Sequence, residues 1–122
     1  MSLADVAEIL GEDFYEEAAT AARCGAFITK KAIYNIATAL GLRIRGGFRD
    51  AMLRSLLEEA ERSGRLVEAL TMLYEYYRSY AALLSPYSSI PHVELSLKKL
   101  EDFLARLRQA ISRLSHAEGE DS

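Results

Sequence analysis

The residues with the clearest chemical potential form a short basic stretch around two glycines, Arg43-Ile44-Arg45-Gly46-Gly47-Phe48-Arg49. Glycines just before a helix leave backbone N–H groups at its positive end, where arginines can close around a phosphate or a carboxylate. An exposed aromatic side chain can in addition stack on a nucleic-acid base. With the two lysines that open the preceding helix, the stretch predicts an anion-binding or nucleic-acid-binding site. The predicted site residues are Lys30, Lys31, Arg43, Arg45, Phe48 and Arg49.

The charge distribution singles out the same part of the chain. The formal net charge is −3, but residues 1–22 carry six acids and no base, whereas residues 23–54 carry seven bases and one acid. Two interpretations remain open: the acidic start packs on the basic segment, or the basic segment contacts the phosphates of a nucleic acid. A P-loop for nucleoside triphosphates is excluded, because Gly47 and Phe48 stand where that loop needs Lys and Ser or Thr.

Residues 29–57 resemble the SAP motif, in which a helix, an extended loop and a second helix bind DNA. The resemblance rests on Leu40-Gly41-Leu42, on Gly47 and Arg49, and on Met52-Leu53, and it covers less than a quarter of the chain. It implies that this segment binds DNA. Residues 53–70 are similar to one hairpin of a tetratricopeptide-type repeat, but no second copy follows, so a solenoid is excluded.

The remaining reactive residues do not form a catalytic or metal-binding pattern. Cys24 is the only cysteine, so an intramolecular disulfide and a multi-cysteine zinc site are excluded, and we interpret it as a small buried hydrophobe. His92 and His116 lie 24 residues apart, which is not a metal-ligand spacing, and we expect them at the surface or at helix ends. We therefore predict a protein without enzymatic activity, cofactor or metal.

The chain reads as a series of helices separated by glycines, which is typical of left-handed helix ends. Apolar residues recur at helical spacing in each segment, and no segment alternates like a strand. The predicted fold class is all-α, a compact bundle of five to six helices ending in a long antiparallel helical hairpin. Six helical segments are expected. The first ends at Gly11, the second covers 13–24 and the third runs from Lys30 to Leu40. The fourth follows Gly46-Gly47 and runs to about Ser63, the fifth runs from Arg65 to about Leu84, and the sixth from Pro91 to about Ser115.

The last two expected helices carry apolar stripes with alternating steps of four and three residues, and a short loop, Ser85 to Ser89, joins them. Such stripes and such a loop predict an antiparallel pair. The first helix of this pair is apolar around most of its girth, so it lies either in the centre of the bundle or against another subunit. In the second case the candidate interface residues are Met72, Tyr74, Tyr76 and Leu83.

Length and composition favour one globular domain, because the chain has 122 residues, half of them hydrophobic and 27% charged. We predict a helical domain over 1–117 and an acidic, frayed tail over 118–122. The start lacks the pattern of a signal peptide, and prolines interrupt the longest uncharged run, so we expect a soluble cytoplasmic protein without a membrane partner. Eleven arginines against four lysines, with one Asn and one Gln, resemble a thermophilic composition.

Two functions follow from these patterns. The first is a small non-catalytic helical protein that acts as a protein-interaction or self-association module, with itself or another protein as its partner. The alternative is a nucleic-acid-binding protein that uses the basic 30–54 segment on backbone phosphates.

Overall fold

The computed structural model describes residues 3–11, 15 and 28–120, and the regular elements within these ranges are all helical. No strand occurs within these ranges, so the predicted all-α class is confirmed. None of the helices described combines the length and the apolar character needed to cross a membrane. The elements are a 3₁₀ turn Ala4–Val6, α1 Ala7–Leu10, α3 Lys30–Ala39, α4 Arg49–Arg62, α5 Leu66–Leu84, a 3₁₀ turn Ser85–Tyr87 and α6 Pro91–Glu120.

Local capping chemistry sets the helix boundaries. The Thr29 side chain accepts a hydrogen bond of 3.0 Å from the backbone N–H of Ala32, which fixes the start of α3 as expected. Gly64 adopts φ +72° after α4, and the next N–H, of Arg65, donates to the carbonyl of Ala60 at 2.7 Å. This left-handed glycine turn reverses the chain directly into α5.

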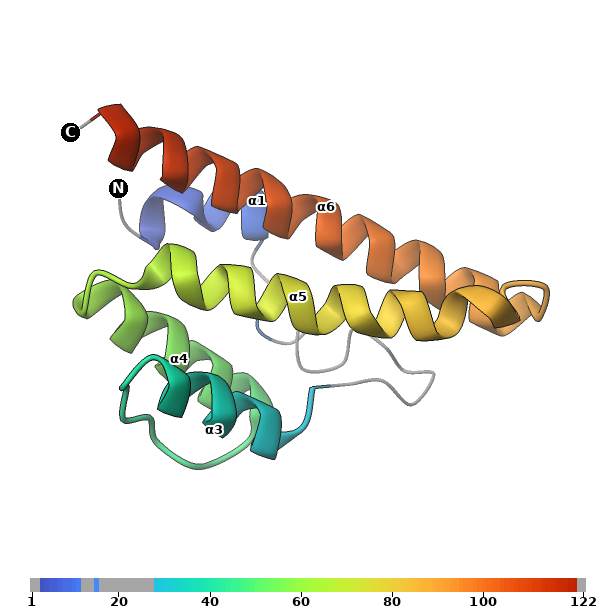
Figure 1. Ribbon diagram of the computed structural model, residues 1–122, viewed down its shortest axis with the longest axis horizontal. Helices are drawn as coiled ribbons and strands as arrows, with labels where there is room; N and C mark the ends of the chain where they lie inside the picture. The colour runs from blue at the N-terminus through green and yellow to red at the C-terminus, as the bar shows by residue number, and fades with distance from the viewer. Residues whose placement is uncertain (1–2, 12–14, 16–27, 121–122) are drawn as a thin grey trace.

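The two longest helices, α5 and α6, form a hairpin to which the other helices attach (Figure 1). The two helices run antiparallel and share the most extensive helix–helix contact, which confirms the predicted hairpin. Tyr77 and Phe103 meet across it edge to face, with ring centroids 5.1 Å apart. Other fully buried residues of the pair include Leu70, Leu73, Leu100 and Leu107.

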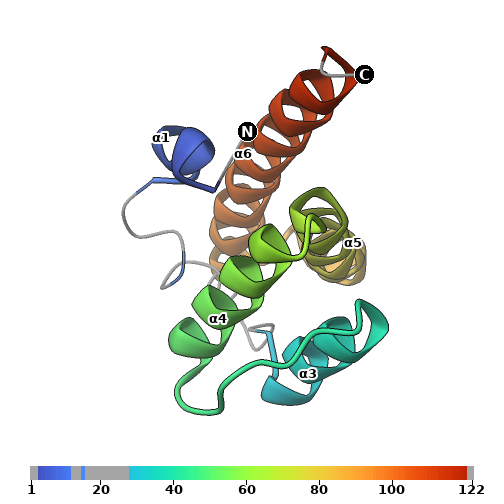
Figure 2. The same ribbon diagram turned by 90° about the vertical axis from the view of Figure 1, so that its left-hand side faces the viewer.

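Helix α5 lies between α6 and the pair of α3 and α4 (Figure 1), and in Figure 2 no described helix lies on its right-hand side. It packs against α6 on one side and against α3 and α4 on the other, while α1 lies along α6. This position accounts for the wide apolar surface of α5 within a single chain. Helices α3 and α4 both run antiparallel to α5, because the connection 40–48 leads back along α3 before α4 begins (Figure 1).

Three details differ from the sequence-based expectation or lie beyond it. Helix α6 continues to Glu120 instead of ending near Ser115, because the apolar stripe ends at Leu114 but no helix-breaking proline follows. The expected irregular loop after α5 contains a 3₁₀ turn, Ser85–Tyr87, with Pro86 inside it. The expected helix 13–24, with Cys24, lies outside the described residues.

Candidate functional site

The basic connection between α3 and α4 is fixed on both neighbouring helices. The backbone N–H of Arg45 donates to the Ser55 hydroxyl of α4 at 3.1 Å. At Gly46 a Cβ atom would stand 3.2 Å from the Tyr34 hydroxyl of α3, so the chain passes close to that tyrosine. Residues 29–57 thus contain α3, a non-helical connection and the first part of α4, with the connection held on both helices.

Four of the six predicted anion-site residues lie at the starts of two helices, which are at the same end of this helix pair: Lys30 and Lys31 begin α3, and Phe48 and Arg49 lead into α4 (Figure 1). Arg43 and Arg45 lie apart from them, in the connection after α3, where Arg45 is beside Ser55 in the middle of α4. Lys30, Lys31, Arg43 and Arg45 are exposed, and Arg49 is half-buried. Phe48 directly precedes α4 and is 83% exposed. A basic surface with one protruding aromatic ring is therefore accessible.

A hollow of about 300 Å³ beside this surface has balanced charge. Its charged lining residues are three arginines and three acids: Arg45, Arg54, Arg62, Asp50, Glu58 and Glu59. Because acidic side chains share this hollow with the arginines, the positive electrostatic potential that attracts an anion is weaker here than the number of arginines alone indicates.

Arg54 is engaged by an aromatic ring. Its guanidinium carbon lies 4.3 Å from the centroid of Tyr15, in a cation–π contact. Burial raises the pKa of the Tyr15 hydroxyl, and the positive charge of Arg54 acts against this rise. This contact ties the N-terminal part of the chain to α4.

Three of the four candidate interface residues are partly covered by the packing of the chain itself. Met72, Tyr74 and Tyr76 are half-buried and pack against the core, and only Leu83, at 67% exposure, is open to solvent. Tyr74 receives a hydrogen bond from the guanidinium of Arg108 on α6. Most of the apolar surface around α5 is thus covered, at least in part, by the chain's own helices.

Tyr76 belongs to a cluster of tyrosines on α5. Its hydroxyl lies 3.2 Å from that of Tyr80, and its ring meets the ring of Tyr77 edge to face. Burial, and then the hydrogen bond with Tyr80, raise the pKa of Tyr76 from 10.0 to about 12, while contacts with Thr29 oppose the rise. These contacts make Tyr76 part of the α3–α5 packing.

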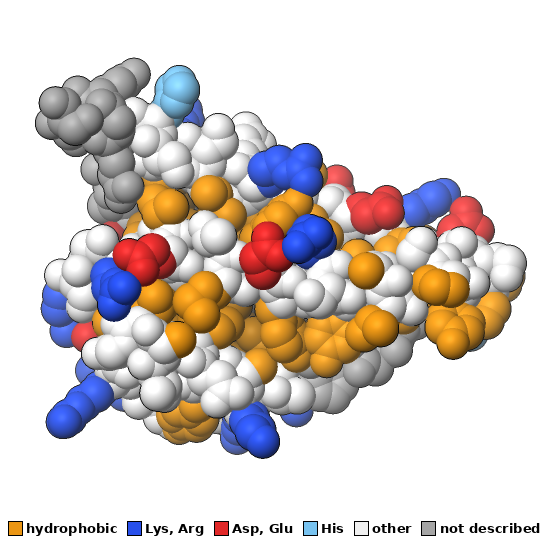
Figure 3. Space-filling model, viewed as in Figure 1, with side chains coloured by type: hydrophobic (Ala, Val, Ile, Leu, Met, Phe, Trp, Pro, Cys, Tyr) orange, Lys and Arg blue, Asp and Glu red, His pale blue; other side chains and the backbone are white. Residues whose placement is uncertain are grey.

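The tip of the α5–α6 hairpin carries an apolar cluster that sequence reasoning missed apart from Leu83. Tyr87 is 59% exposed, Leu95 57% and Ile90 40%. Hydrophobic side chains continue along α5 to this end of the molecule (Figure 3). The signal was present in the sequence, since residues 79–93 contain no Asp, Glu, Lys or Arg.

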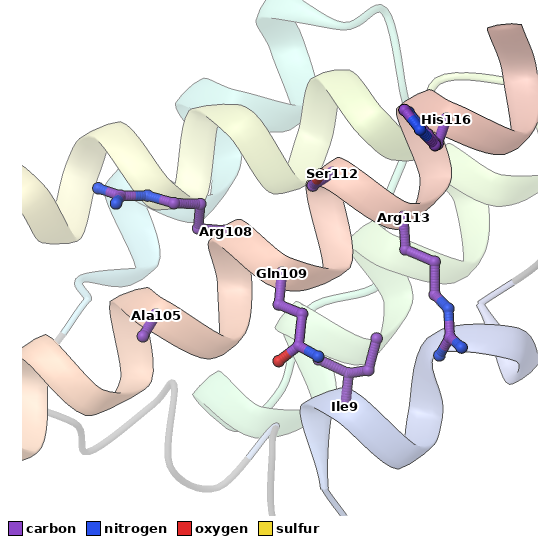
Figure 4. A pocket seen from close by; sticks show the side chains of 7 residues that line it. All are labelled: Ile9, Ala105, Arg108, Gln109, Ser112, Arg113 and His116. Atoms are coloured by element: carbon purple, nitrogen blue, oxygen red, sulfur yellow. The ribbon is translucent and has the colours of Figure 1, made fainter.

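A second hollow, of about 560 Å³, lies between α1 and the C-terminal half of α6, and sequence reasoning also missed it. Its lining residues are Ile9, Ala105, Arg108, Gln109, Ser112, Arg113 and His116 (Figure 4). No spacing within α6 indicates this site, because α1 completes it from a distant part of the sequence.

Metal binding and known relatives give no further assignment. Among the described residues, no group of three or more His, Cys, Asp or Glu side chains could hold a metal ion. His92 and His116 are both exposed, as expected. Comparisons with protein-family models, curated proteins and solved structures gave no match to this chain.

Proposed function

We propose that this protein is a small interaction module that self-associates through the tip of its α5–α6 hairpin. The observation that carries the proposal is that four large apolar side chains are exposed within residues 83–95, where the hairpin turns: Leu83, Tyr87, Ile90 and Leu95. Large apolar side chains gathered at one surface are typical of contact sites, whereas single exposed ones are ordinary. The hairpin tip is defined here as these four residues.

The charges around the hairpin tip favour a second copy of the chain as the partner. The flanking charges are paired within their own helices: Arg78 with Glu75 at 2.6 Å and Lys98 with Glu94 at 3.4 Å. Neither a strongly acidic nor a strongly basic partner finds a complementary surface, but two neutral tips meet without repulsion. A two-fold contact between identical patches is the commonest form of self-association.

The size of the hairpin tip sets the expected strength. A stable interface buries about 800 Å² on each partner, and four side chains cover less than that. We therefore expect a concentration-dependent, reversible dimer rather than a permanent one. Tyr87 suits such a contact, because its ring can be buried while its hydroxyl keeps a water partner.

Sedimentation of the full chain over a range of concentrations tests this proposal. Leu83→Glu should remove the dimer while the helical circular dichroism is kept, because the side chain is largely exposed in the monomer. Phe48→Glu is the matched control, since it places the same charge at an exposed apolar residue far from the hairpin tip. A wild type that is monomeric at every concentration, or equal loss of the dimer in both variants, contradicts the proposal.

Nucleic-acid binding is the second candidate, favoured by the 83% exposure of Phe48 and by the exposure of Arg43 and Arg45 in the connection that precedes it. Binding of a mixed-sequence duplex should weaken with salt, with a log–log slope of about −0.9 per phosphate contact. Replacing both arginines by Ala should reduce the slope by about two contacts. Replacing Arg62 and Arg78, which are paired within their helices, should leave it unchanged. Absence of binding at about 50 mM salt rejects this candidate.

A further inference from the structure

We propose that the hollow between α1 and α6 binds a small organic phosphate, with Arg113 and Gln109 as its main ligands. This site is separate from the hairpin tip: it lies along the C-terminal half of α6, whereas the tip precedes and begins that helix (Figure 1). The inference does not depend on self-association.

Contacts between α1 and α6 hold the walls of the hollow in place. Arg106 donates a hydrogen bond of 3.3 Å from its Nη1 to the carbonyl oxygen of Leu10 at the end of α1. Ile9 is half-buried and packs against the core. Helix α1 is therefore held on α6, and the short side chains of Ala105 and Ser112 leave the space between them open.

The lining gives the hollow a net positive charge. Arg108 and Arg113 line it, and none of its lining residues is Asp or Glu. The hollow beside α4 is the internal comparison, because there three arginines face three acids. Of these two hollows, only the one between α1 and α6 offers unbalanced positive charge to an anion.

The side chains of the hollow differ in their roles. Arg113 and Gln109 reach toward α1 and Ile9, whereas the guanidinium of Arg108 lies toward α5 (Figure 4), where it donates to the Tyr74 hydroxyl. Arg113 and Gln109 can therefore donate N–H groups to one anion, and Arg108 contributes its charge from the opposite side. Ser112 and His116 lie between them along α6.

The chemistry of the lining indicates the class of ligand. The Arg113 guanidinium and the donors of Gln109 and Ser112 together exceed what one carboxylate accepts, and the nearby charge of Arg108 favours a dianion, so a phosphate monoester is favoured. Ile9 and Ala105 provide an apolar surface for an organic group. The hollow, of about 560 Å³, is open to solvent, because all of its lining residues except Ile9 are exposed, so it suits a small ligand bound at the surface.

Titration of the full chain with phenyl phosphate, followed by heteronuclear NMR, tests the assignment. Saturable shifts should centre on Ile9 and on residues 105–116, and inorganic phosphate, without an apolar group, should bind more weakly. Arg113→Gln should raise the dissociation constant by about tenfold, the effect of losing one charged hydrogen-bond donor. Arg62→Gln, an exposed arginine of the balanced hollow, should leave it unchanged.

Each other result overturns the proposal. Absence of shifts over 105–116, or equal affinity of Arg113→Gln and the wild type, shows that the hollow is not the site. Benzoate binding as tightly as phenyl phosphate shows that the phosphate assignment is wrong. Helical circular dichroism of Arg113→Gln, an exposed position, verifies that the comparison is between folded proteins.

Discussion

The guanidinium of Arg108 on α6 lies 5.5 Å from the ring centroid of Tyr74 on α5 and donates a hydrogen bond to the hydroxyl of that tyrosine. The contact joins the two helices of the hairpin outside the buried stripe. It also uses the polar end of a residue whose ring packs on the core. A tyrosine that the sequence places on a candidate interface is thus a link within the chain.

Replacing the two partners of this link separately and together should reveal a favourable coupling. Tyr74→Phe removes the hydroxyl and keeps the ring, so we expect a loss of about 1 kcal/mol. Arg108→Ala removes both the hydrogen bond and the cation–π contact. A coupling of about 0.5–1 kcal/mol between the two changes in urea unfolding is expected for a partly exposed pair. Strict additivity would show that the contact contributes nothing.

The turn at Gly64 provides a test of backbone conformation alone. Its φ of +72° is left-handed, and an added Cβ would meet no atom within 4 Å. Gly64→Ala should therefore lower the free energy of unfolding by about 1–2 kcal/mol through backbone strain without any steric clash. Ser63→Ala, one residue earlier with φ −90°, is the matched control and should stay within about 0.5 kcal/mol of the wild type. Equal effects would contradict this explanation.

Much of the fold follows from periodicity and capping, which are local properties. The bounds of α3, the glycine turn at Gly64 and the pairing of α5 with α6 all depend on residues close in sequence. The predicted end of α6 was wrong, because burial marks the apolar stripe only up to Leu114, whereas no proline ends the helix before Glu120. The central place of α5 was one of two open alternatives, since periodicity cannot tell which neighbour covers an apolar face.

The candidate sites were less predictable, because they depend on contacts between distant segments. The exposure of Phe48 agrees with the expectation. The acids that share a hollow with Arg45 come from α4, and the arginines of α6 gain a site only where α1 completes it. Met72 and Tyr76 lie off the main apolar stripe of α5, but both are partly buried and pack against the core.

Truncation of two leucines of α5 should have very different effects on stability. Leu73 is fully buried, so Leu73→Ala should destabilise the protein by about 2–5 kcal/mol. Leu83 is 67% exposed, so Leu83→Ala should change stability by less than about 0.5 kcal/mol but should weaken self-association. Urea unfolding and sedimentation of the same two variants provide the measurements. A large loss of stability in Leu83→Ala would mean that the hairpin tip is part of the core.

The tyrosine cluster of α5 should make stability fall at high pH. Burial and the hydrogen bond with Tyr80 raise the pKa of Tyr76 to about 12 in the folded protein, and burial raises that of Tyr77, against 10.0 for an ordinary tyrosine. Above pH 10 the unfolded chain loses these protons first, so it binds fewer protons than the folded state, and the free energy of unfolding falls as pH rises. Below pH 10 the stabilisation is fully present, and the contribution of Tyr76 is lost through about pH 12. Tyr76→Phe cannot ionise at this position, so its stability deficit relative to the wild type should shrink between about pH 10 and pH 12 in matched urea titrations. A deficit that stays constant over this range would show that Tyr76 does not couple its ionisation to folding.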